Sequence, residues 1–222
     1  MSSNPKYQLY AFWRTSATYR VRVALNLKGI EAQEQFIDLD AGENRTEAFL
    51  KVNPMGAIPA LVVGSETPLT QSLAIMEFLE ELHPHPPLLP KDPHGRARVR
   101  SIALVLAADT HPLVTSRIKK YLISKGGFDD TTFKAWQTEW FTTGLTALEK
   151  RLAAETETGK FCHGDMPGMA DICLASIAAV MRVFKVSVPN IPKIDGIVAN
   201  CEQLEAFGKA APHLQFGAPA PA

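Results

Sequence analysis

Apolar and polar positions follow different periods in the two halves of this chain. In the first half, short apolar runs bounded by Gly, Pro and Ser predict strands, and stretches with apolar residues every three or four positions predict helices. The expected strands cover residues 8–13, 34–39, 60–63 and 68–70, and the expected helices cover residues 17–28, 45–52 and 72–82. This order predicts a small mixed sheet packed between helices, an α/β layer arrangement.

The second half shows only the helical period. Helical stretches are expected at residues 96–124, 132–155 and 170–184. The last of them is apolar on nearly all sides, which is typical of a helix buried at the centre of its domain. We therefore expect the second half to form an all-α domain.

A proline-rich segment separates the halves. Five of the eleven residues from His83 to Pro93 are proline, and such a run continues neither a helix nor a central strand. We expect a first domain over residues 1–84, a stiff linker over 85–93 and a helical domain over 94–222. The histidines of this segment are expected to be solvated loop residues, so no metal site is predicted.

Composition narrows the classes of function. The chain has 23 Lys plus Arg and 23 Asp plus Glu, and this balance argues against a nucleic-acid partner or a membrane surface, which require a basic excess. The start of the chain has no apolar signal segment, and no apolar run approaches the ~20 residues that span a bilayer. Cys162, Cys173 and Cys201 lie far apart, without zinc or redox spacing, so we expect buried thiols and a cytoplasmic protein.

Hydroxyl residues stand where the first strand gives way to the first helix. Thr15 and Ser16 are natural helix N-caps, and capping by Ser16 is the plain structural interpretation. A helix N-terminus also presents unpaired N–H groups and a partial positive charge, which stabilise an anion. A hydroxyl there can donate to a thiolate and lower its pKa from the ~8.5 of a free thiol.

Two further segments of the first half point to the same kind of site. Pro59 stands just before a short apolar strand, which favours a cis Ile58–Pro59 bond that turns the backbone toward an extended peptide. Gln71 and Ser72 open the next helix, with Ser72 as its expected N-cap beside a carboxylate site. Together the three segments predict one cleft.

Matching motifs extend over essentially the whole chain. The sequence resembles the glutathione transferase superfamily and, within it, the zeta class of maleylacetoacetate and maleylpyruvate isomerases. The matching segments are Phe12-Trp13-Arg14-Thr15-Ser16, residues 20–29, Asn53-Pro54-Met55, Ile58-Pro59, residues 71–75, His111-Pro112-Leu113, Gly164-Asp165 and Ala170-Asp171. The resemblance implies a thioredoxin-like N-terminal domain that binds glutathione, and a helical-bundle C-terminal domain that carries the electrophile-binding side.

The resemblance also implies roles for individual residues. Thr15 and Ser16 match hydroxyls that face the glutathione sulfur. Arg14 is expected to be catalytic with them, as a cation that binds the substrate carboxylate and holds the enediolate-like intermediate. The residues that match glutathione contacts are Asn44, Ile58, Pro59, Gln71, Ser72, His111 and Thr115. Arg117 and Arg182 are candidates for a substrate carboxylate, and residues 168–171 match a capping box of the buried helix, with Gly168 as its N-cap.

The chain departs from the zeta pattern in three places. Ala17 replaces the usual cysteine, and Val183 stands where the isomerases carry an arginine, with Arg182 one residue early. One residue is ~100° around a helix, so Arg182 points elsewhere than the family's arginine. Residues 113–117 lack the usual asparagine.

The expected activity is glutathione-dependent cis–trans isomerisation of a maleyl-type dicarbonyl acid, a reaction of aromatic-compound catabolism. One alternative is a general glutathione transferase or peroxidase for hydrophobic electrophiles, with Tyr10 as the partner of the thiol, although packing is the favoured interpretation of Tyr10. Another is a non-catalytic binding module with the same fold. A homodimer is also expected, because residues 1–84 are net acidic and residues 96–100 carry three arginines, with Phe49, Met55 and Leu104 supplying apolar contact.

Overall fold

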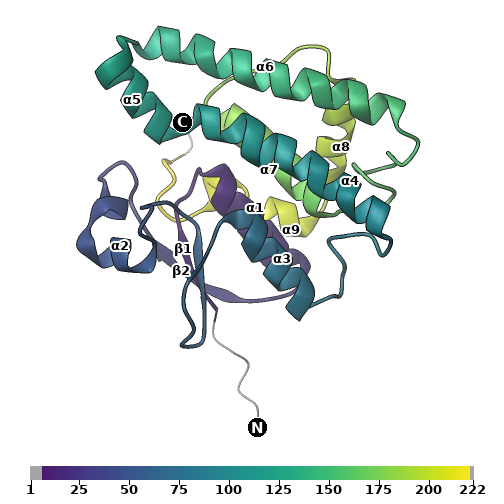
Figure 1. The fold of residues 1–222 in the computed structure, drawn as a ribbon, viewed down its shortest axis with the longest axis horizontal. Coiled ribbons are helices and arrows are strands. Elements are labelled where there is room, and N and C mark those ends of the chain that lie inside the picture. Colours follow the sequence, from purple (N-terminus) through teal and green to yellow (C-terminus); the bar gives the residue numbers. More distant parts are fainter. Residues whose placement is uncertain (1–6, 221–222) are drawn as a thin grey trace. The chain divides into compact units, whose positions relative to one another are not determined.

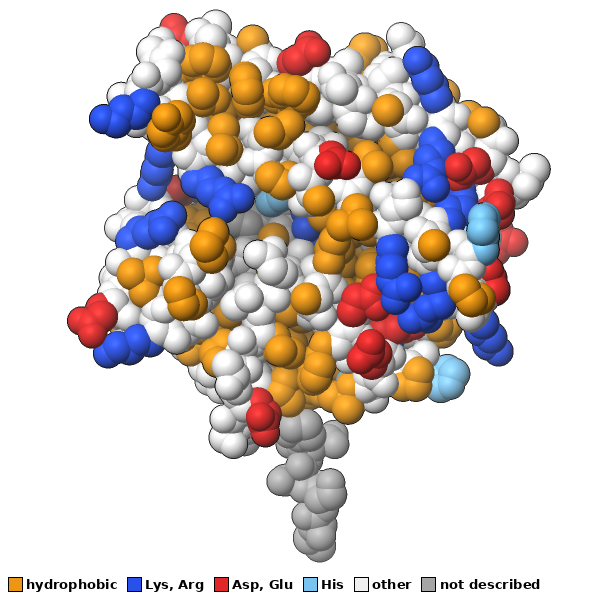
Figure 2. Space-filling view, in the orientation of Figure 1, with side chains coloured by type: hydrophobic (Ala, Val, Ile, Leu, Met, Phe, Trp, Pro, Cys, Tyr) orange, Lys and Arg blue, Asp and Glu red, His pale blue; other side chains and the backbone are white. Residues whose placement is uncertain are grey.

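The structure is a computed structural model that describes residues 7–220 (Figure 1). Its contacts divide the chain into two compact units. The first unit runs to Leu88 and includes the segment from Glu205 onward, and the second spans Leu89–Leu204. None of the described helices is long and apolar enough to cross a membrane. On the face drawn in Figure 2, both acidic and basic side chains are present.

The first unit has the predicted α/β arrangement. Its elements are β1 (Tyr7–Ala11), α1 (Ser16–Leu27), β2 (Ala32–Phe36), η1 (Glu43–Arg45), α2 (Glu47–Val52), β3 (Ala60–Val63), β4 (Leu69–Thr70), α3 (Ser72–Leu82), α9 (Glu205–Gly208) and η4 (Pro212–Leu214). The sheet order is β2-β1-β3-β4, with β2 parallel to β1 and the other pairs antiparallel. This is the mixed sheet that the strand and helix order predicts.

The core of this unit lies between the sheet and the helix pair α1 and α3, which lie side by side (Figure 1). Alternation along β1 buries Leu9, which pairs in register with Leu61 of β3, and both side chains are fully buried. Val21 of α1 and Ile75 of α3 are also fully buried, so each helix turns its apolar stripe to the same core. Burial of a leucine-sized side chain contributes about 1.5–3 kcal/mol to folding.

The last residues of the chain pack with the first unit, which corrects the expectation that residues 94–222 form one helical domain. Asn26 of α1 donates from Nδ2 to the carbonyl oxygen of Ala206 (2.9 Å), and Phe207 is buried. The ring of Phe216 meets that of Phe36 edge to face at 5.1 Å. These contacts join sequence-distant segments, which a periodicity argument does not detect.

The proline-rich segment is anchored rather than freely extended at its start. The Lys28 ammonium, whose side chain is fully buried, donates to Glu80 Oε2 (2.8 Å) and to the carbonyl oxygens of His83 (2.6 Å) and Pro86 (2.9 Å). Glu80 also accepts from the Leu88 N–H at 2.8 Å. Residues 83–88 are therefore fixed to α1 and α3 within the first unit.

The second unit is helical, and its described residues form no strand, as predicted. It contains α4 (Pro93–Leu104), η2 (Val105–Thr110), η3 (His111–Val114), α5 (Ser116–Gly126), α6 (Asp130–Ala154), α7 (Met169–Val183) and α8 (Pro192–Glu202). The apolar helix α7 packs against α4 and α8 and buries most of its side chains. Its predicted central place is confirmed.

The single helix expected over residues 96–124 is wrong, because the chain passes from α4 through a π-helical turn and a 3-10 turn before α5 begins. The Thr110 hydroxyl donates to the Val105 carbonyl at 2.8 Å, which supports the wide turn. Pro112 lacks the N–H that a continuous helix needs. Gly144 of α6 lies so close to Thr110 that a Cβ at position 144 would clash with its hydroxyl.

The start of α7 is held by Asp171, as the capping-box interpretation predicts. One carboxylate oxygen accepts from the Gly168 N–H (2.9 Å), and the other accepts from the Cys162 N–H (2.7 Å). Asp171 is buried, and this burial raises its pKa to about 6, although the two backbone bonds act in the opposite direction. The carboxyl group therefore holds its proton more tightly in the folded chain than in the unfolded chain.

Asp171 is expected to make the free energy of unfolding depend on pH. Its contribution is fully present below the unfolded pKa near 3.8 and is lost as pH rises through about 6. The free energy of unfolding of the wild type minus that of Asp171→Asn should fall by on the order of 3 kcal/mol between pH 4 and pH 7. Denaturant unfolding of both proteins across this range measures the difference, and a difference independent of pH would contradict the raised pKa.

Candidate active site

Three connections of the first unit meet at one edge of its sheet. β1 and β3 are antiparallel, so the carboxyl end of β1 lies beside the start of β3, where Tyr10 pairs with Ala60. β3 and β4 are also antiparallel, and Ala60 pairs with Thr70 at the end of β4. The segments that follow or precede these ends are 12–16, 58–59 and 71–72, and strand pairing brings them together. These are the three segments that the sequence predicts to share a cleft.

The first of these segments forms the start of α1. Thr15 is the N-cap, with extended backbone, and its Oγ1 accepts from the Thr18 N–H at 3.4 Å while donating to the Thr18 hydroxyl at 2.6 Å. The expectation that Ser16 caps this helix is therefore wrong by one residue. Ser16 is the first helical residue, and its side chain is fully buried.

A buried arginine that sequence reasoning missed joins two of the segments. Arg20 donates from one terminal nitrogen to Ser16 Oγ (3.0 Å) and from the other to Ser72 Oγ (2.9 Å), and it is 2% exposed. The spacing of Ser16 and Arg20 is the signal that could have identified it, because side chains at i and i+4 lie on one helix face.

Arg14 is bound within its own unit. Its guanidinium makes a bidentate pair with Asp40, at 2.7 and 2.5 Å, and lies over the rings of Phe12 and Trp13 at 4.9 and 5.3 Å. The side chain of Arg14 is 20% exposed and that of Asp40 is 59% exposed. The pair fixes the loop before α1, so this guanidinium is already committed to a carboxylate of the protein.

The second segment follows a loop held by two asparagines. Asn53 is buried, donates from Nδ2 to the Ala57 carbonyl (2.6 Å) and accepts at Oδ1 from the Met55 N–H (3.1 Å). Asn44 donates to the Gly56 carbonyl at 2.6 Å, so its amide nitrogen holds this loop. The Ile58–Pro59 bond is cis, as predicted.

The third segment begins α3 in an unexpected conformation. Gln71 has φ +68° and is the N-cap residue, while Ser72 is the first helical residue. The prediction that Ser72 is the N-cap is therefore wrong, again by one residue. A positive φ is uncommon for a residue with a side chain, and such conformations cluster at ligand sites. Gln71 is exposed, so its side chain is accessible to a ligand at this edge.

Tyr10 lies on β1 near the same edge and packs against the ring of Phe49 edge to face, with centroids 5.8 Å apart. The packing interpretation of Tyr10 therefore has a specific partner. It leaves the hydroxyl residues at the start of α1 as the first candidates to hold a thiolate.

The remaining candidates belong to the second unit. His111 begins η3, and the Thr115 hydroxyl donates to the Pro112 carbonyl at 3.1 Å as the chain enters α5. Arg117 is exposed in the first turn of α5, where its charge adds to the positive end of the helix. Arg182 is exposed on α7 and forms an ion pair with Glu202 of α8.

The chemistry of the first-unit edge is that of an anion site. The N-termini of α1 and α3, the hydroxyls of Ser16 and Ser72, and the Arg20 cation all favour negative charge there. Among the described residues, no cluster of three or more His, Cys, Asp or Glu could hold a metal ion.

Comparison with known proteins identifies the family of this chain. The family Glutathione S-transferase, N-terminal domain, matches residues 5–81. A maleylpyruvate isomerase from a Ralstonia species is 39% identical over 94% of this chain and 98% of its own length. A crystal structure of maleylacetoacetate isomerase from Methylobacterium extorquens AM1, with bound malonate and GSH, is 45% identical. It covers 96% of this chain and 100% of its own, with a TM-score of 0.94.

A third relative gives the class. The holo structure of a maleyl pyruvate isomerase, described as a bacterial glutathione S-transferase of the zeta class, is 39% identical. It covers 96% of this chain and 100% of its own, with a TM-score of 0.93. The chain therefore belongs to the glutathione S-transferase family and, within it, to the zeta-class-like group of the maleylacetoacetate and maleylpyruvate isomerases.

Proposed function

We propose that this protein is a glutathione-dependent enzyme that isomerises a maleyl-type dicarbonyl acid from cis to trans. The observation that carries the proposal is the meeting of segments 12–16, 58–59 and 71–72 at one sheet edge, with hydroxyls and two helix N-termini among them. Relatives named for this activity match nearly the whole chain at 39–45% identity, which supports the same reaction class.

The residues of this edge fit glutathione as cofactor. Ile58, before the cis proline, offers its backbone N–H and C=O to an extended peptide. Gln71 and Ser72 hold the γ-glutamyl end at the start of α3, where a carboxylate is stabilised by helix N–H groups. Asn44 supports the loop before Ile58 rather than contacting the peptide with its amide nitrogen.

Bound glutathione supplies a thiolate that adds to the substrate double bond and is eliminated again after rotation about the resulting single bond. Ser16 is buried beneath the first turn of α1 and fixes it, and the Thr15 hydroxyl turns from Thr18 to donate to the sulfur. The backbone N–H groups of this turn and their positive local potential hold the sulfur in its anionic form. The same groups are aimed at an anion before reaction begins, and such preorganised donors need no rearrangement during the chemical step.

Substrate carboxylates require separate groups. We assign Arg117 to this role, with His111 and Thr115 on the short segment before it, because a cation in the first turn of α5 adds to the helix dipole. Arg182 receives no role, because it is exposed and paired with Glu202. Arg14 orients the loop before α1 through Asp40.

A second function has one observation in its favour. Position 183 is valine, and the neighbouring Arg182 forms a surface ion pair, so α7 lacks the arginine that the zeta pattern places there. Without that charge the enzyme would act as a general glutathione transferase or peroxidase on hydrophobic electrophiles.

Side-by-side turnover assays separate the two functions. Maleylacetoacetate, maleylpyruvate and a chlorinated aromatic electrophile are each incubated with the enzyme and glutathione. The proposal predicts that a maleyl substrate has a kcat/KM at least about tenfold above that of the aromatic, a difference of ~1.4 kcal/mol in transition-state stabilisation. A preference for the aromatic electrophile would establish the transferase instead.

We also propose a homodimer, with support from the exposure of Met55 (61%) and Leu104 (47%). Phe49 is buried within its own unit and is removed from the expected interface. Arg98 does not contribute to the expected basic surface of residues 96–100, because it is buried and bound to Glu155. Light scattering should give twice the 24.3 kDa of one chain, and a mass of one chain that does not change with concentration would contradict the dimer.

We also propose that the protein is cytoplasmic. All three cysteines are buried, and burial raises the pKa of the Cys162 and Cys201 thiols, so these groups are kept protonated and inert. Thiols of this kind suit a reducing compartment.

A further inference from the structure

Arg20 occupies a position that neither the sequence motifs nor the proposed mechanism explains. It lies one turn into α1, and its side chain is buried beneath the start of that helix. One guanidinium nitrogen donates to Ser16 Oγ at 3.0 Å and the other donates to Ser72 Oγ at 2.9 Å. A single side chain thus connects the first residues of α1 and α3, which are 56 positions apart in the sequence.

The shape of the guanidinium makes this connection rigid. Its nitrogens lie in one plane at fixed separation, so binding both hydroxyl oxygens fixes the distance between them. In the proposed function, the start of α1 faces the sulfur of glutathione and the start of α3 faces its γ-glutamyl carboxylate. Arg20 therefore sets the spacing between the two ends of the cofactor site without touching the cofactor.

Arg20 also supplies charge at this place. Each serine oxygen accepts from Arg20, and the guanidinium cation adds to the positive ends of the two helices. This charge favours anions at the starts of α1 and α3.

We propose that Arg20 is a positioning residue of the glutathione site: through Ser16 and Ser72 it holds the N-termini of α1 and α3 at the spacing that the thiolate and the γ-glutamyl carboxylate require. The inference rests on the proposed function, since it assigns those two groups to glutathione. It goes beyond that function because it assigns the spacing between the thiolate and carboxylate positions to one buried side chain.

The test compares Arg20→Met and Arg20→Lys with the wild type. Isothermal titration calorimetry measures binding of glutathione and of S-methylglutathione, which has no ionisable thiol. The ultraviolet absorbance of the thiolate, followed against pH, gives the thiol pKa of bound glutathione. Arg20→Met should weaken binding of both ligands about tenfold, as expected for the loss of one charge-assisted contact, and should raise the bound thiol pKa by about one unit.

Arg20→Lys separates charge from geometry. Lysine keeps the cation but cannot hold two oxygens in a fixed fork, so the thiol pKa should recover in part while the affinity stays low. Near-wild-type affinity and thiol pKa in the folded Arg20→Met protein would overturn the inference. If Arg20→Met does not fold, wild-type behaviour of Arg20→Lys in both measurements overturns it instead.

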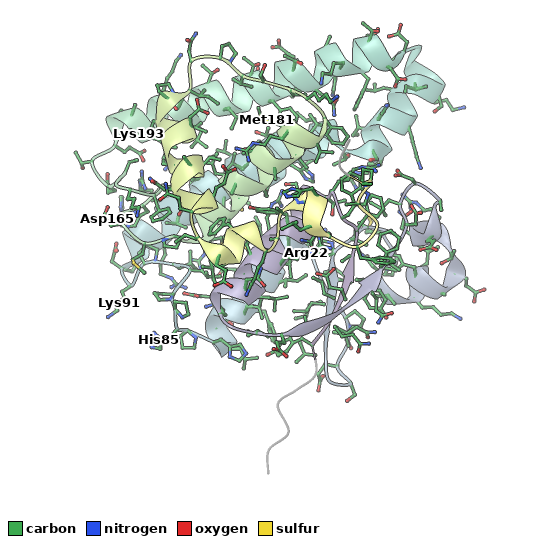
Figure 3. The ribbon with its side chains drawn as sticks, turned by 180° about the vertical axis from the view of Figure 1, so that it is seen from behind. Arg22, His85, Lys91, Asp165, Met181 and Lys193 are labelled. Carbon is green, nitrogen blue, oxygen red and sulfur yellow. The ribbon has the colours of Figure 1, made fainter. Side chains whose placement is uncertain are left out.

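Arg22→Met provides the matched control. Arg22, labelled in Figure 3, projects from the same helix and is 5% exposed, but it pairs with Glu34 of β2 through two bonds of 2.7 Å. Its one contact with segment 12–16 is a longer bond to the Phe12 carbonyl, at 3.4 Å. Its loss should leave the bound thiol pKa unchanged, and an equal shift in this control would assign the effect to general loosening of α1. If the wild type itself binds no glutathione, the proposed function fails first, and the inference fails with it.

Discussion

Replacement of Ser16 by alanine is expected to lower kcat/KM for the maleyl substrate by about 10²-fold or more. The hydroxyl of Ser16 is fully buried at the first residue of α1, where it accepts from Arg20 and fixes the helix N–H groups that stabilise the anion. Loss of preorganised anion stabilisation of this kind costs an enzyme about 10²–10³ in rate. Steady-state kinetics and the thiol pKa of bound glutathione, measured on the same protein, give the size and the cause of the loss.

Two further variants are compared with Ser16→Ala. Thr15→Ala removes the N-cap of α1, so it should reduce stability by about 1 kcal/mol and affect activity less than Ser16→Ala if the N–H groups that Ser16 fixes stabilise the thiolate more than the Thr15 hydroxyl does. Ser65→Ala, in the exposed turn between β3 and β4, should change nothing measurable. If both single variants and the Thr15/Ser16 double variant retain wild-type rates, the hydroxyl mechanism is wrong, and Tyr10→Phe becomes the next test.

Replacement of Lys28 by methionine is expected to lower the free energy of unfolding by about 3–5 kcal/mol. The ammonium is buried and has three oxygen partners, on Glu80, His83 and Pro86. Removing the cation leaves the Glu80 carboxylate buried without the Lys28 charge, which is the main part of the loss. Denaturant unfolding of the two proteins measures it.

Lys51→Met is the matched control, because Lys51 forms an exposed pair with Glu47 on α2 and such pairs contribute little. The loss in Lys28→Met should also be smaller when Glu80 is replaced by leucine in the same chain, since neither charge then remains in the interior. A cost below about 1 kcal/mol in the single variant would show that the pair does not anchor the proline-rich segment.

Local pattern was enough to predict most of the first unit. The alternation of β1, the apolar run of β3 and the helical spacing of α1 and α3 each predict the observed element, because each buries one regular face. The cis bond before Pro59 and the capping role of Asp171 follow from the motifs that carry them. In these places, neighbouring residues determine the local structure.

The errors arise where distant segments decide the structure. The expected helix over 96–124 ends at Leu104, and the irregular turns that follow bring Thr110 against Gly144, on another helix. Phe207 and Phe216 join the first unit through contacts with α1 and β2, although they follow the helical unit in sequence. No periodicity within these segments records those partners.

The local structure around the candidate site residues differs in detail from its prediction. Ser16 and Ser72 were expected as helix caps, but Thr15 and Gln71 hold those positions, and both serines lie one residue inside. Arg20 was missed because its role depends on Ser72, which the fold brings to it across the sequence. Arg14 and Arg182 are drawn into ion pairs with Asp40 and Glu202 that sequence spacing does not predict.

Measurement of the free glutathione thiol during turnover distinguishes an isomerase from a transferase. An isomerase forms and breaks one carbon–sulfur bond per cycle, so free glutathione is returned, whereas a transferase consumes it. Wild-type enzyme, maleylacetoacetate or maleylpyruvate, and a limiting amount of glutathione are mixed, and the trans product and the free thiol are measured together. An isomerase should form many equivalents of trans product at a constant thiol concentration, and the loss of one thiol for each product formed would identify a transferase instead.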